Sequence, residues 1–434
     1  GYYASSLNGD RLIGFHVNHG YDKAADFYDS TRFYEKLYRP DIVKLAFQLG
    51  SEEAAIAEAS KKRRTEKVEV ATILPPKVRI LSPSDGSTVK EVSVTLEATA
   101  TPPSGGRVEE VIVKINGRPL DTGQRGISRR KDIKPDAAGV VRILREVPLA
   151  PGENYIEVLA RGEDSLSNPA TVRVVREEVK VEDSLLPDLY VLSVGVSDYE
   201  AEGLDLNYAD NDARSLAEAF TSQRGGLFRE VHQKVLTDSN ATRGDVLDGF
   251  DWVERGVTQH DLAVVFLAGH GVNDDRGDYW FLPHDADPDR LRRSAVNWRD
   301  LTALLENMPG KTLLMVDTCK AGNATGTRRY RAMSNRSVTD ALKQLRQAEA
   351  GVVVMSSSTG KELSQEADEW GHGAFTKAIL EGLKGPADVN RDNAITFKEL
   401  DLYVSRAVKE LTNGRQHPTT QVPRHMPDFP VYLR

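Results

Sequence analysis

Cys319 is the only cysteine among the 434 residues, and it comes shortly after an apolar run. Residues 313–316 are all apolar, which predicts a buried parallel strand, and polar and small residues follow directly. His270 comes in the same way after a second apolar run, residues 262–268. A thiol and an imidazole at the ends of two neighbouring parallel strands would meet at one edge of the sheet. There they could act as a nucleophile and its base.

The ordinary alternative for a lone cysteine is a small buried side chain, and a lone histidine is even less informative. The joint pattern favours catalysis here. Each residue follows a buried strand, and each is followed closely by glycine or another small residue. His270 also precedes Cys319 by about 50 positions, the spacing found in caspases.

Five short segments together resemble the caspase-like cysteine peptidases, specifically their prokaryotic and metacaspase side. These segments are residues 190–196, 207–213, 268–271, 317–322 and 371–376. The resemblance extends from about residue 187 to residue 434. The animal-caspase pentapeptide Gln-Ala-Cys-x-Gly is absent, and the metacaspase pattern Asp-x-Cys-His-x-Gly fits except that Lys320 replaces its histidine.

The resemblance implies an α/β fold and a cysteine endopeptidase of the clan CD type. In it, Cys319 attacks the scissile carbonyl and His270 moves the proton. The backbone N–H groups of Gly271 and Cys319 would bind the oxyanion. The chemistry requires no cofactor.

The resemblance also assigns Asp212 and Asp317 to the pocket for the residue before the cut, and places Ser357 beside the substrate cleft. Two carboxylates favour a guanidinium or an ammonium group, so we expect cleavage after Arg or Lys rather than after Asp. The alternative for Asp212 and its neighbour Asp210 is to cap a helix. Asp317 at the end of a buried strand needs a partner in any case.

Composition predicts a globular protein of two or three domains. The chain has 57 basic and 65 acidic residues, a net charge of −8 and 39% hydrophobic residues. This acidic balance disfavours nucleic acid as a partner. No apolar run approaches the ~20 residues of a membrane span, and no signal-peptide pattern opens the sequence. A single cysteine allows no internal disulfide, so we expect a cytoplasmic location.

Three segments differ in character. Residues 1–74 are an aromatic-rich N-terminal connector segment and linker. Residues 75–180 predict an all-β, immunoglobulin-like sandwich, and residues 185–434 predict a caspase-like domain with a mainly parallel sheet. Strands of the sandwich are expected at 77–81, 88–100, 108–116, 140–147, 154–161 and 171–175, with a tight turn at Asn116 and Gly117.

In the third segment strands and helices alternate. The expected strands are 189–196, 262–268, 311–317 and 351–356. The expected helices are 209–222, 243–255 with Thr242 as N-cap, 298–308, 338–349 and 374–383.

Residues 388–399 fit the calcium loop D-x-N-x-D-x-x-I-x-x-x-E between two helices. The predicted ligands are Asp388, Asn390, Asp392, Ala394 and Glu399. Asn393 stands where this loop usually has glycine, and asparagine tolerates the left-handed conformation next best. The alternative is a decayed loop that only caps helices.

Residues 323–338 are polar and read as an exposed loop. An enzyme that prefers basic residues could cut itself there, at Arg328, Arg329 or Arg331, as members of the resembled family often do. The alternative is that these arginines only form a solvated surface.

The rival hypothesis for the whole chain is a catalytically silent adaptor that binds a regulatory protein through the β-sandwich or the N-terminal segment. The intact histidine, cysteine and glycines favour the peptidase.

Overall fold

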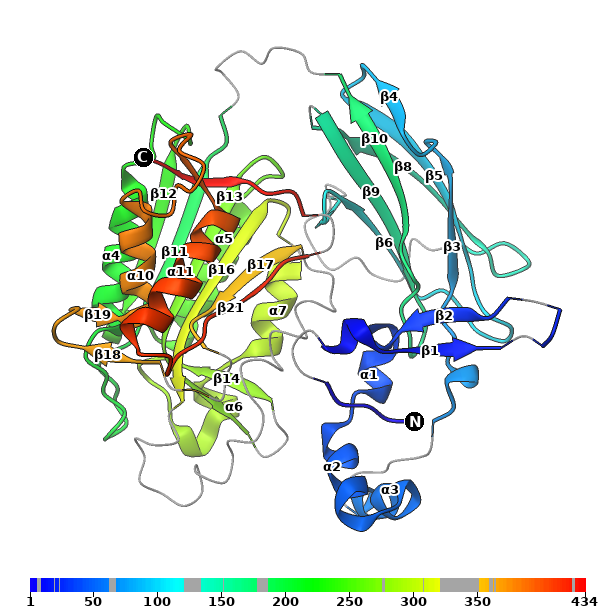
Figure 1. Ribbon diagram of the computed structural model, residues 1–434, viewed down its shortest axis with the longest axis horizontal. Coiled ribbons are helices and arrows are strands. Elements are labelled where there is room, and N and C mark those ends of the chain that lie inside the picture. Colours follow the sequence, from blue (N-terminus) through cyan, green and yellow to red (C-terminus); the bar gives the residue numbers. More distant parts are fainter. Residues whose placement is uncertain are drawn as a thin grey trace. The chain divides into compact units, whose positions relative to one another are not determined.

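The structure is a computed structural model. It describes residues 1–5, 9–18, 20–22, 24–61, 68–120, 134–150, 152–177, 186–274, 278–306, 308–320, 351–358, 362, 364–423 and 426–434, without the side chains of residues 11, 306, 319 and 320. Two compact units are present (Figure 1). The first comprises Gly1–Asn116 and Leu120–Val179, and the second comprises Gly117–Pro119 and Lys180–Arg434.

The N-terminal part of the first unit is built of short elements around aromatic side chains. Tyr3, Tyr28 and Phe33 are buried together with Leu37. The elements are η1 (Gly9–Leu12), β1 (Gly14–Val17), β2 (Asp26–Asp29), η2 (Ser30–Phe33), α1 (Tyr34–Leu37), α2 (Pro40–Leu49), α3 (Glu52–Ser60) and η3 (Val70–Thr72). This part packs on the following domain of the same unit, since the Arg32 guanidinium donates to the carbonyl of Ser167 at 3.2 Å.

Residues 77–176 form a sandwich of two sheets. Its strands are β3 (Lys77–Ser82), β4 (Ser87–Val89), β5 (Ser93–Thr101), β6 (Glu110–Ile115), β7 (Arg118–Pro119), β8 (Val141–Pro148), β9 (Gly152–Arg161) and β10 (Ala170–Arg176). One sheet has the order β3-β5-β8 and the other β4-β10-β9-β6-β7. Every second residue of β5, namely Leu96, Ala98 and Ala100, is fully buried in the core between them. Asn116 and Gly117 both have positive φ, as a two-residue hairpin turn requires.

The single strand predicted over residues 88–100 is wrong. That stretch forms two strands in different sheets, because β4 pairs in parallel with β10 while β5 pairs antiparallel with β3 and β8. The chain crosses between the sheets at residues 90–92, where charged residues interrupt the apolar pattern.

The second unit alternates strands and helices. Its strands are β11 (Leu189–Gly195), β12 (Val231–Thr237), β13 (Leu262–Asn273), β14 (Tyr279–Leu282), β15 (Val296–Asn297), β16 (Lys311–Lys320), β17 (Val352–Ser356), β18 (Glu366–Ala367), β19 (His372–Gly373), β20 (Ala394–Thr396), β21 (Thr419–Gln421) and β22 (Pro430–Leu433). Its α-helices are α4 (Ala209–Thr221), α5 (Arg243–Gly256), α6 (Leu291–Ser294), α7 (Trp298–Glu306), α10 (Ala374–Leu383) and α11 (Phe397–Leu411), and its short 3-10 helices are η5 (Asp238–Asn240) and η6 (Pro288–Arg290).

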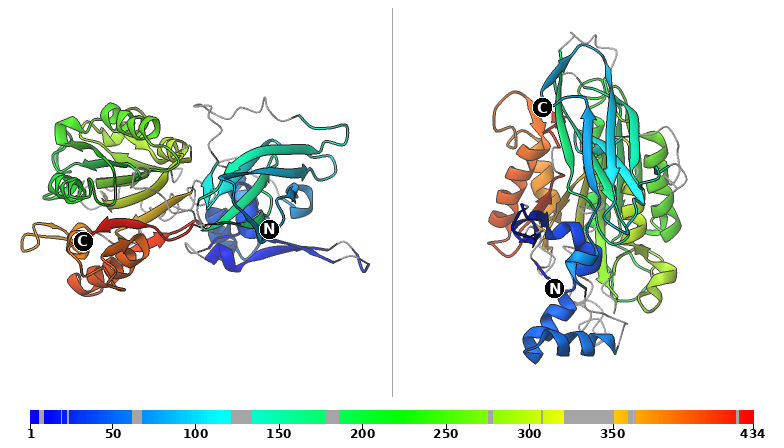
Figure 2. Two further views of the ribbon diagram at one scale, coloured as in Figure 1. Left: turned by 90° about the horizontal axis from the view of Figure 1, so that it is seen from above. Right: turned by 90° about the vertical axis from the view of Figure 1, so that its right-hand side faces the viewer.

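The central sheet has the order β12-β11-β13-β16-β17-β21, with β14 paired to β13. The first five strands run parallel, while β21 and β14 run antiparallel to their partners. The predicted α/β class with a mainly parallel sheet is therefore confirmed. Helices cover both faces, and in Figure 2 α10 and α11 (orange to red) lie on the side opposite α5 and α7.

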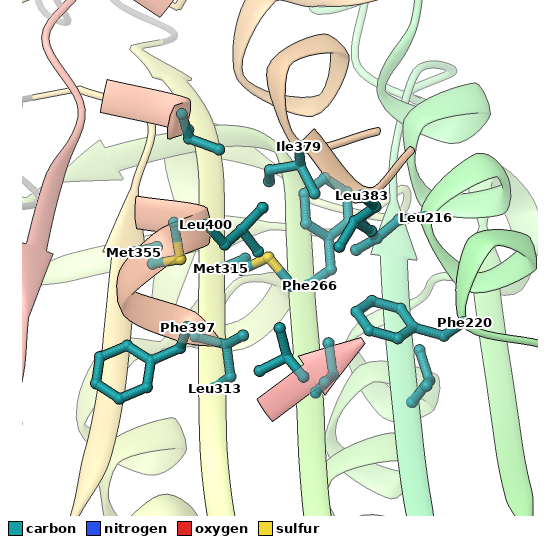
Figure 3. Packing of buried hydrophobic residues seen from close by; sticks show 14 of the residues in the cluster. Leu216, Phe220, Phe266, Leu313, Met315, Met355, Ile379, Leu383, Phe397 and Leu400 are labelled. Atoms are coloured by element: carbon teal, nitrogen blue, oxygen red, sulfur yellow. The ribbon is translucent and has the colours of Figure 1, made fainter. Parts of the chain in front are cut away.

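The core on the α4, α10 and α11 face consists of side chains from alternate strand positions. Phe266, Leu313 and Met315 point from the sheet toward Ile379 and Leu400 of the helices (Figure 3). All five are less than 1% exposed. Burial of each such side chain contributes about 1.5–3 kcal/mol. This apolar layer therefore favours one register between neighbouring strands.

The predicted N-cap of α5 is correct. Thr242 forms a capping box with Asp245, in which each side chain accepts the other residue's backbone N–H. The helix predicted over residues 338–349 lies outside the described residues. β12 was not predicted, because its buried and exposed residues alternate irregularly between two turns.

Two strands run further than their apolar patterns suggested. β13 was expected to end at residue 268 and β16 at residue 317, but they continue to Asn273 and Lys320. The continuation of β13 is possible because β14 supplies a second partner, with His270 opposite Leu282 and Gly271 opposite Phe281. His270 and Cys319 thus lie within strands rather than in the loops that follow them.

We predict that Gly195→Ala destabilises the second unit. A Cβ at this position, the end of β11, would overlap the backbone carbonyl of Ala209 at the start of α4. The helix would have to move away, which costs about 1–3 kcal/mol. Thermal unfolding followed by circular dichroism should show a midpoint several degrees lower than the wild type. Gly226→Ala is the matched control, since its Cβ meets no atom closer than 3.6 Å; an equal effect of the two changes would contradict the prediction.

Candidate active site

The extended pairing of β13 with β16 brings the two predicted catalytic residues to neighbouring positions. In this parallel ladder His270 is the register partner of Cys319, and Gly271 is the partner of Lys320. The position of the Cys319 side chain lies outside the description, so the backbone pairing is the observation that bears on a dyad. It supports the predicted approach of the two groups at one edge of the sheet.

The His270 ring is oriented by backbone groups. Its side chain is buried, and Nε2 lies 2.8 Å from the carbonyl oxygen of Leu204. A carbonyl can only accept, so Nε2 carries the hydrogen, and in the neutral ring Nδ1 is the basic nitrogen. The backbone N–H of His270 donates to the hydroxyl of Tyr199 at 2.9 Å, which fixes the strand at this point.

Positions 269 and 271 must be glycine, because neighbouring tyrosine side chains leave no room for a Cβ atom. Gly269 has φ +147°, and a Cβ there would lie 2.8 Å from the Tyr199 hydroxyl. A Cβ on Gly271 would overlap the hydroxyl of Tyr279, which bonds Thr318 at 2.6 Å. Tyr199 and Tyr279 were missed from the sequence because only the fold brings them to the histidine. The oxyanion roles of the Gly271 and Cys319 N–H groups stay predictions.

An acid-lined cavity lies beside these strands. The empty space between its lining residues, open solvent at the mouth included, is about 240 Å³, and its interior has room for about one water molecule. The lining residues are Leu206, Ala209, Asp212, Ala268, Gly269, Asp317, Ser364, Glu366 and Gly373. A Cβ on Gly373 would lie 3.1 Å from one oxygen each of Asp212 and Asp317, so the two carboxylates predicted for the pocket do lie together.

Asp317, on β16, is a buried acid with an incomplete set of partners. Burial first, and the charge of Asp212 second, raise its pKa to about 7, against hydrogen bonds from Ser357 and Ser364 that lower it. Its Oδ1 has no hydrogen-bond partner among the described residues. Ser357, predicted to lie beside the substrate cleft, is buried, bonds Ser364 at 2.7 Å and donates to Asp317, and it is not among the residues that line the cavity.

Asp212 lies in the first turn of α4 and both of its oxygens are engaged. Oδ1 lies 2.6 Å from His372 Nδ1, and Oδ2 accepts the Gly373 N–H at 3.0 Å. Burial raises the pKa of Asp212, and the bonds from His372 and Gly373 oppose that rise. The helix-capping alternative is wrong, because the N-cap of α4 is Tyr208 and it has no side-chain cap bond.

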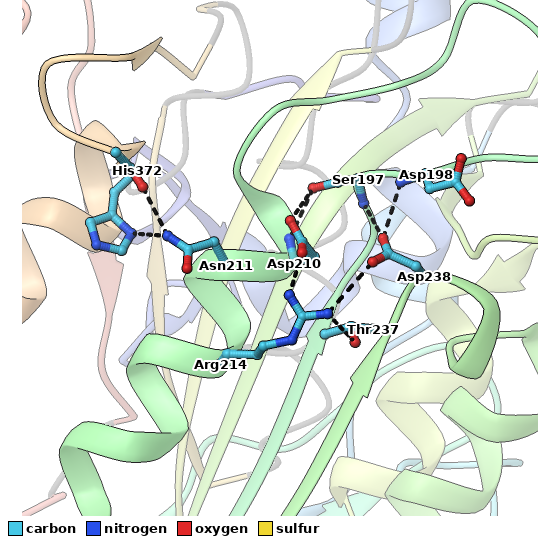
Figure 4. A network of polar contacts seen from close by, with 9 residues as sticks. Ser197, Asp198, Asp210, Asn211, Arg214, Thr237, Asp238 and His372 are labelled. Carbon is cyan, nitrogen blue, oxygen red and sulfur yellow. Dashed lines mark hydrogen bonds and ion pairs between the residues drawn. The ribbon is translucent and has the colours of Figure 1, made fainter.

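Asp210, the other acid of this turn, belongs to a separate network (Figure 4). Burial raises its pKa, but hydrogen bonds from Ser197 and Arg214 outweigh this, and the net pKa is lowered. Arg214 also donates to Thr237 at 2.9 Å, at the end of β12. The network ties the start of α4 to the sheet and thereby sets the position of Asp212.

Glu366, on β18, is a third acid of the cavity that sequence reasoning missed. Its pKa is raised by burial first and by the charge of Asp212, while hydrogen bonds from Asn207 lower it. β18 pairs with β19 so that Glu366 lies opposite Gly373. The only sequence signal for it was an acidic stretch, residues 366–369, shortly before the Gly-His-Gly motif at residues 371–373.

The 388–399 loop has the expected turn but not a gathered set of acids. Arg391 and Asn393 have positive φ. Glu399 caps α11 through Thr396 and also accepts the Asn390 N–H at 3.3 Å. Within the described part of the chain, no group of three or more His, Cys, Asp or Glu side chains could hold a metal ion. The oxygen donors of this loop are of the type that calcium prefers, and no finding tests whether they bind it, so calcium binding stays a prediction.

Two further observations concern the chain as a whole. Arg328, Arg329 and Arg331, the predicted self-cleavage positions, lie outside the described residues. Among the helices that the structure describes, none combines the length and the apolar character needed to cross a membrane.

Comparison with solved structures finds distant likenesses. Protein GSU0716 from Geobacter sulfurreducens is 18% identical, with 54% of this chain and 93% of that chain covered and a TM-score of 0.40. Pro-sf-caspase-1 is 13% identical, with 56% and 93% covered and a TM-score of 0.33. Fibronectin(III)-like modules of Clostridium thermocellum CbhA are 20% identical, with 23% and 97% covered and a TM-score of 0.17. No curated protein matches the chain.

Family models give the assignment. A model described as the bacterial Ig domain matches residues 76–131, and one described as the caspase domain matches residues 189–429, which is more than half of the chain. The resemblance inferred from the sequence is thereby confirmed at the level of the family. The chain belongs to the caspase-domain family of cysteine peptidases, with an immunoglobulin-like domain preceding the caspase domain.

Proposed function

We propose that this chain is a cysteine endopeptidase that cleaves protein substrates after Arg or Lys, with Cys319 as nucleophile and His270 as base. The observation that carries the proposal is the pairing of His270 with Cys319 on adjacent parallel strands beside a cavity lined by three acids. A reducing compartment such as the cytoplasm would keep Cys319 as a thiol.

The chemistry follows from the orientation of His270. Its Nδ1 takes the thiol proton of Cys319, and the thiolate attacks the scissile carbonyl. The N–H groups of Gly271 and Cys319 bind the oxyanion, and the imidazolium then gives its proton to the leaving amine. Water hydrolyses the remaining thioester. The carbonyl of Leu204 accepts the Nε2 hydrogen in every step and so keeps Nδ1 toward the reacting atoms.

Specificity rests on the cavity. Asp317 Oδ1 is buried without a hydrogen-bond partner among the described residues, and a guanidinium or ammonium group would supply one together with a compensating charge. Asp212 and Glu366 add negative potential from two other sides. A silent adaptor is not favoured, since recognition through the β-sandwich would need neither a buried histidine beside the cysteine strand nor this cavity.

Hydrolysis is expected to depend on both members of the dyad. Cys319→Ala and His270→Ala should each lower kcat by at least about 10³-fold, because nucleophile and base act as one unit. A library of peptides analysed by mass spectrometry measures both the rate and the position of the cut. His260→Ala, at an exposed histidine, is the control. Near-normal turnover in either dyad variant would refute the mechanism.

We predict that the preference for a basic residue increases as the pH rises through about 7. Below that pH Asp317 holds a proton and offers no charge; above it, the carboxylate attracts the substrate cation. The measurement is the ratio of kcat/KM for two peptides that differ only in Arg or its neutral isostere citrulline before the cut. This ratio cancels the titration of the dyad.

In Asp317→Asn the same ratio should be at least about tenfold lower at pH 8, and the rise with pH should be much smaller. Asparagine keeps the size of the side chain, so loss of fold is not the expected cause. Preferred cleavage after Asp, or a ratio that does not respond to Asp317, would sink the pocket assignment.

Calcium binding to residues 388–399 is a second, separate proposal. Calorimetry with the full chain should show binding at up to millimolar calcium, and Asp392→Asn should weaken it by about tenfold or more because one charged ligand is lost. This variant retains an oxygen to accept the Ala394 N–H, a bond that Asp392 makes at 2.8 Å. Glu399→Gln is less informative because Glu399 also caps α11. Absence of heat at millimolar calcium in the wild type would end the proposal.

A further inference from the structure

His372 is the one basic group in contact with the acids of the cavity among the described residues. It lies on β19, next to Gly373, and its side chain is 18% exposed while that of Asp212 is 3% exposed. Its Nδ1 lies 2.6 Å from Asp212 Oδ1. The His372 side chain is therefore partly accessible to solvent while it contacts a carboxylate that is almost fully buried.

The direction of this contact is fixed by chemistry. A carboxylate oxygen accepts, so the hydrogen is on Nδ1 of His372. Asn211 Nδ2 lies further from the same nitrogen, at 3.3 Å, and donates to the carbonyl of Gly371 at 2.9 Å (Figure 4). Asn211 thus holds the backbone of the hairpin in place, and the ring of His372 is left to Asp212.

The three acids of the cavity therefore differ in whether a basic partner already contacts them. Asp212 Oδ1 is bonded by His372, whereas neither Asp317 nor Glu366 forms an ion pair with any residue the structure describes. A cationic side chain entering the cavity would find Asp317 and Glu366 without a counter-charge but would find Asp212 already bonded. The contact with His372 therefore determines how strongly Asp212 can interact with a basic side chain of the substrate.

We propose that His372 is a specificity-determining residue, whose imidazole competes with the basic side chain of the substrate for Asp212. The inference rests on the proposed function, since it requires a substrate with a basic residue before the cut. A neutral imidazole leaves the negative charge of Asp212 to the substrate. A protonated imidazole neutralises it and also repels the incoming cation. His372 therefore reduces the selectivity for Arg and Lys when the pH falls.

Other titratable groups surround this pair and change charge as well. Asp317 comes from β16, Glu366 from β18, and Asp368 from the turn that follows β18, where it accepts a hydrogen bond from Tyr208 at 2.6 Å. The contribution of His372 is the part of the pH dependence that a neutral replacement removes while these groups stay in place.

The test compares three proteins between pH 5.5 and pH 8.5: the wild type, His372→Gln and His372→Lys. Gln can still donate to Asp212 but has no charge, and Lys is charged throughout this range. The readout is the ratio of kcat/KM for the Arg peptide to that for the citrulline peptide, which divides out changes shared by both substrates. His260→Gln, at an exposed histidine, is the matched control.

At pH 5.5 the ratio should be about tenfold higher in His372→Gln than in the wild type, the size expected for one charge-assisted contact. At pH 8.5 it should be about tenfold lower in His372→Lys than in the wild type. His260→Gln should follow the wild type at every pH. If wild type and His372→Gln show the same pH dependence, the inference is wrong.

A second measurement does not need peptidase activity. In full-length Cys319→Ala with labelled histidines, NMR follows the titration of His372 with and without agmatine, a small guanidinium compound. Agmatine should move the midpoint of the His372 titration to lower pH, because two cations would then share Asp212, and should leave His260 unchanged. If agmatine has this effect but the wild type cuts no peptide, the proposed function fails, and of the inference only the competition between His372 and a guanidinium for Asp212 stands. If peptides are cut after Arg and agmatine leaves His372 unchanged, the inference fails and the proposed function stands.

Discussion

The parallel pairing of β13 with β16 is the interaction on which the candidate active site depends. Packing of apolar side chains keeps the two strands in register, and the hydrogen-bonded ladder continues beyond the apolar part to His270 and Cys319. A shift by one residue would turn each of these side chains to the other face of the sheet. The antiparallel strand β14 makes the continuation possible by pairing with the far end of β13. The placing of His270 opposite Cys319 is therefore set by strand register rather than by loop conformation.

The same edge of the sheet carries a concentration of negative charge that the fold must tolerate. Asp212, Asp317 and Glu366 come from a helix, a central strand and a hairpin, and burial raises the pKa of all three. The structure offers them hydroxyl and backbone N–H donors and one imidazole rather than the Lys or Arg partners common at the surface. A protein that only needed stability would be better served by apolar residues in these positions. The arrangement makes sense if a cation from outside completes it.

How much of this was predictable from the sequence depends on the range of the interactions involved. Long apolar runs predicted the strands that carry His270 and Cys319, because burial on both faces leaves a continuous pattern. Asp212 and Asp317 were both predicted from the resemblance to the family, which places acidic residues in the first-helix opening and two positions before the cysteine. The strand extensions were not predicted, because they lie beyond the apolar runs, and that of β13 depends on pairing with β14, the next strand along the chain, which was not predicted either. Glu366 could not be predicted, since an acidic residue in a short hairpin looks like any solvated turn until the fold brings it to the cavity.

The buried charge also connects substrate recognition to stability. A carboxyl whose pKa is raised from 3.8 to about 7, as that of Asp317 is, binds its proton more tightly in the folded than in the unfolded chain. Its contribution to stability is therefore present at low pH and is lost as the pH rises from about 4 to about 7. A bound guanidinium reverses this, because it favours the ionised form of Asp317. Asp317 thus contributes least to the stability of the fold at the pH where the proposed pocket would bind a basic side chain best, and a cationic ligand that binds there should stabilise the second unit more at pH 8 than at pH 5.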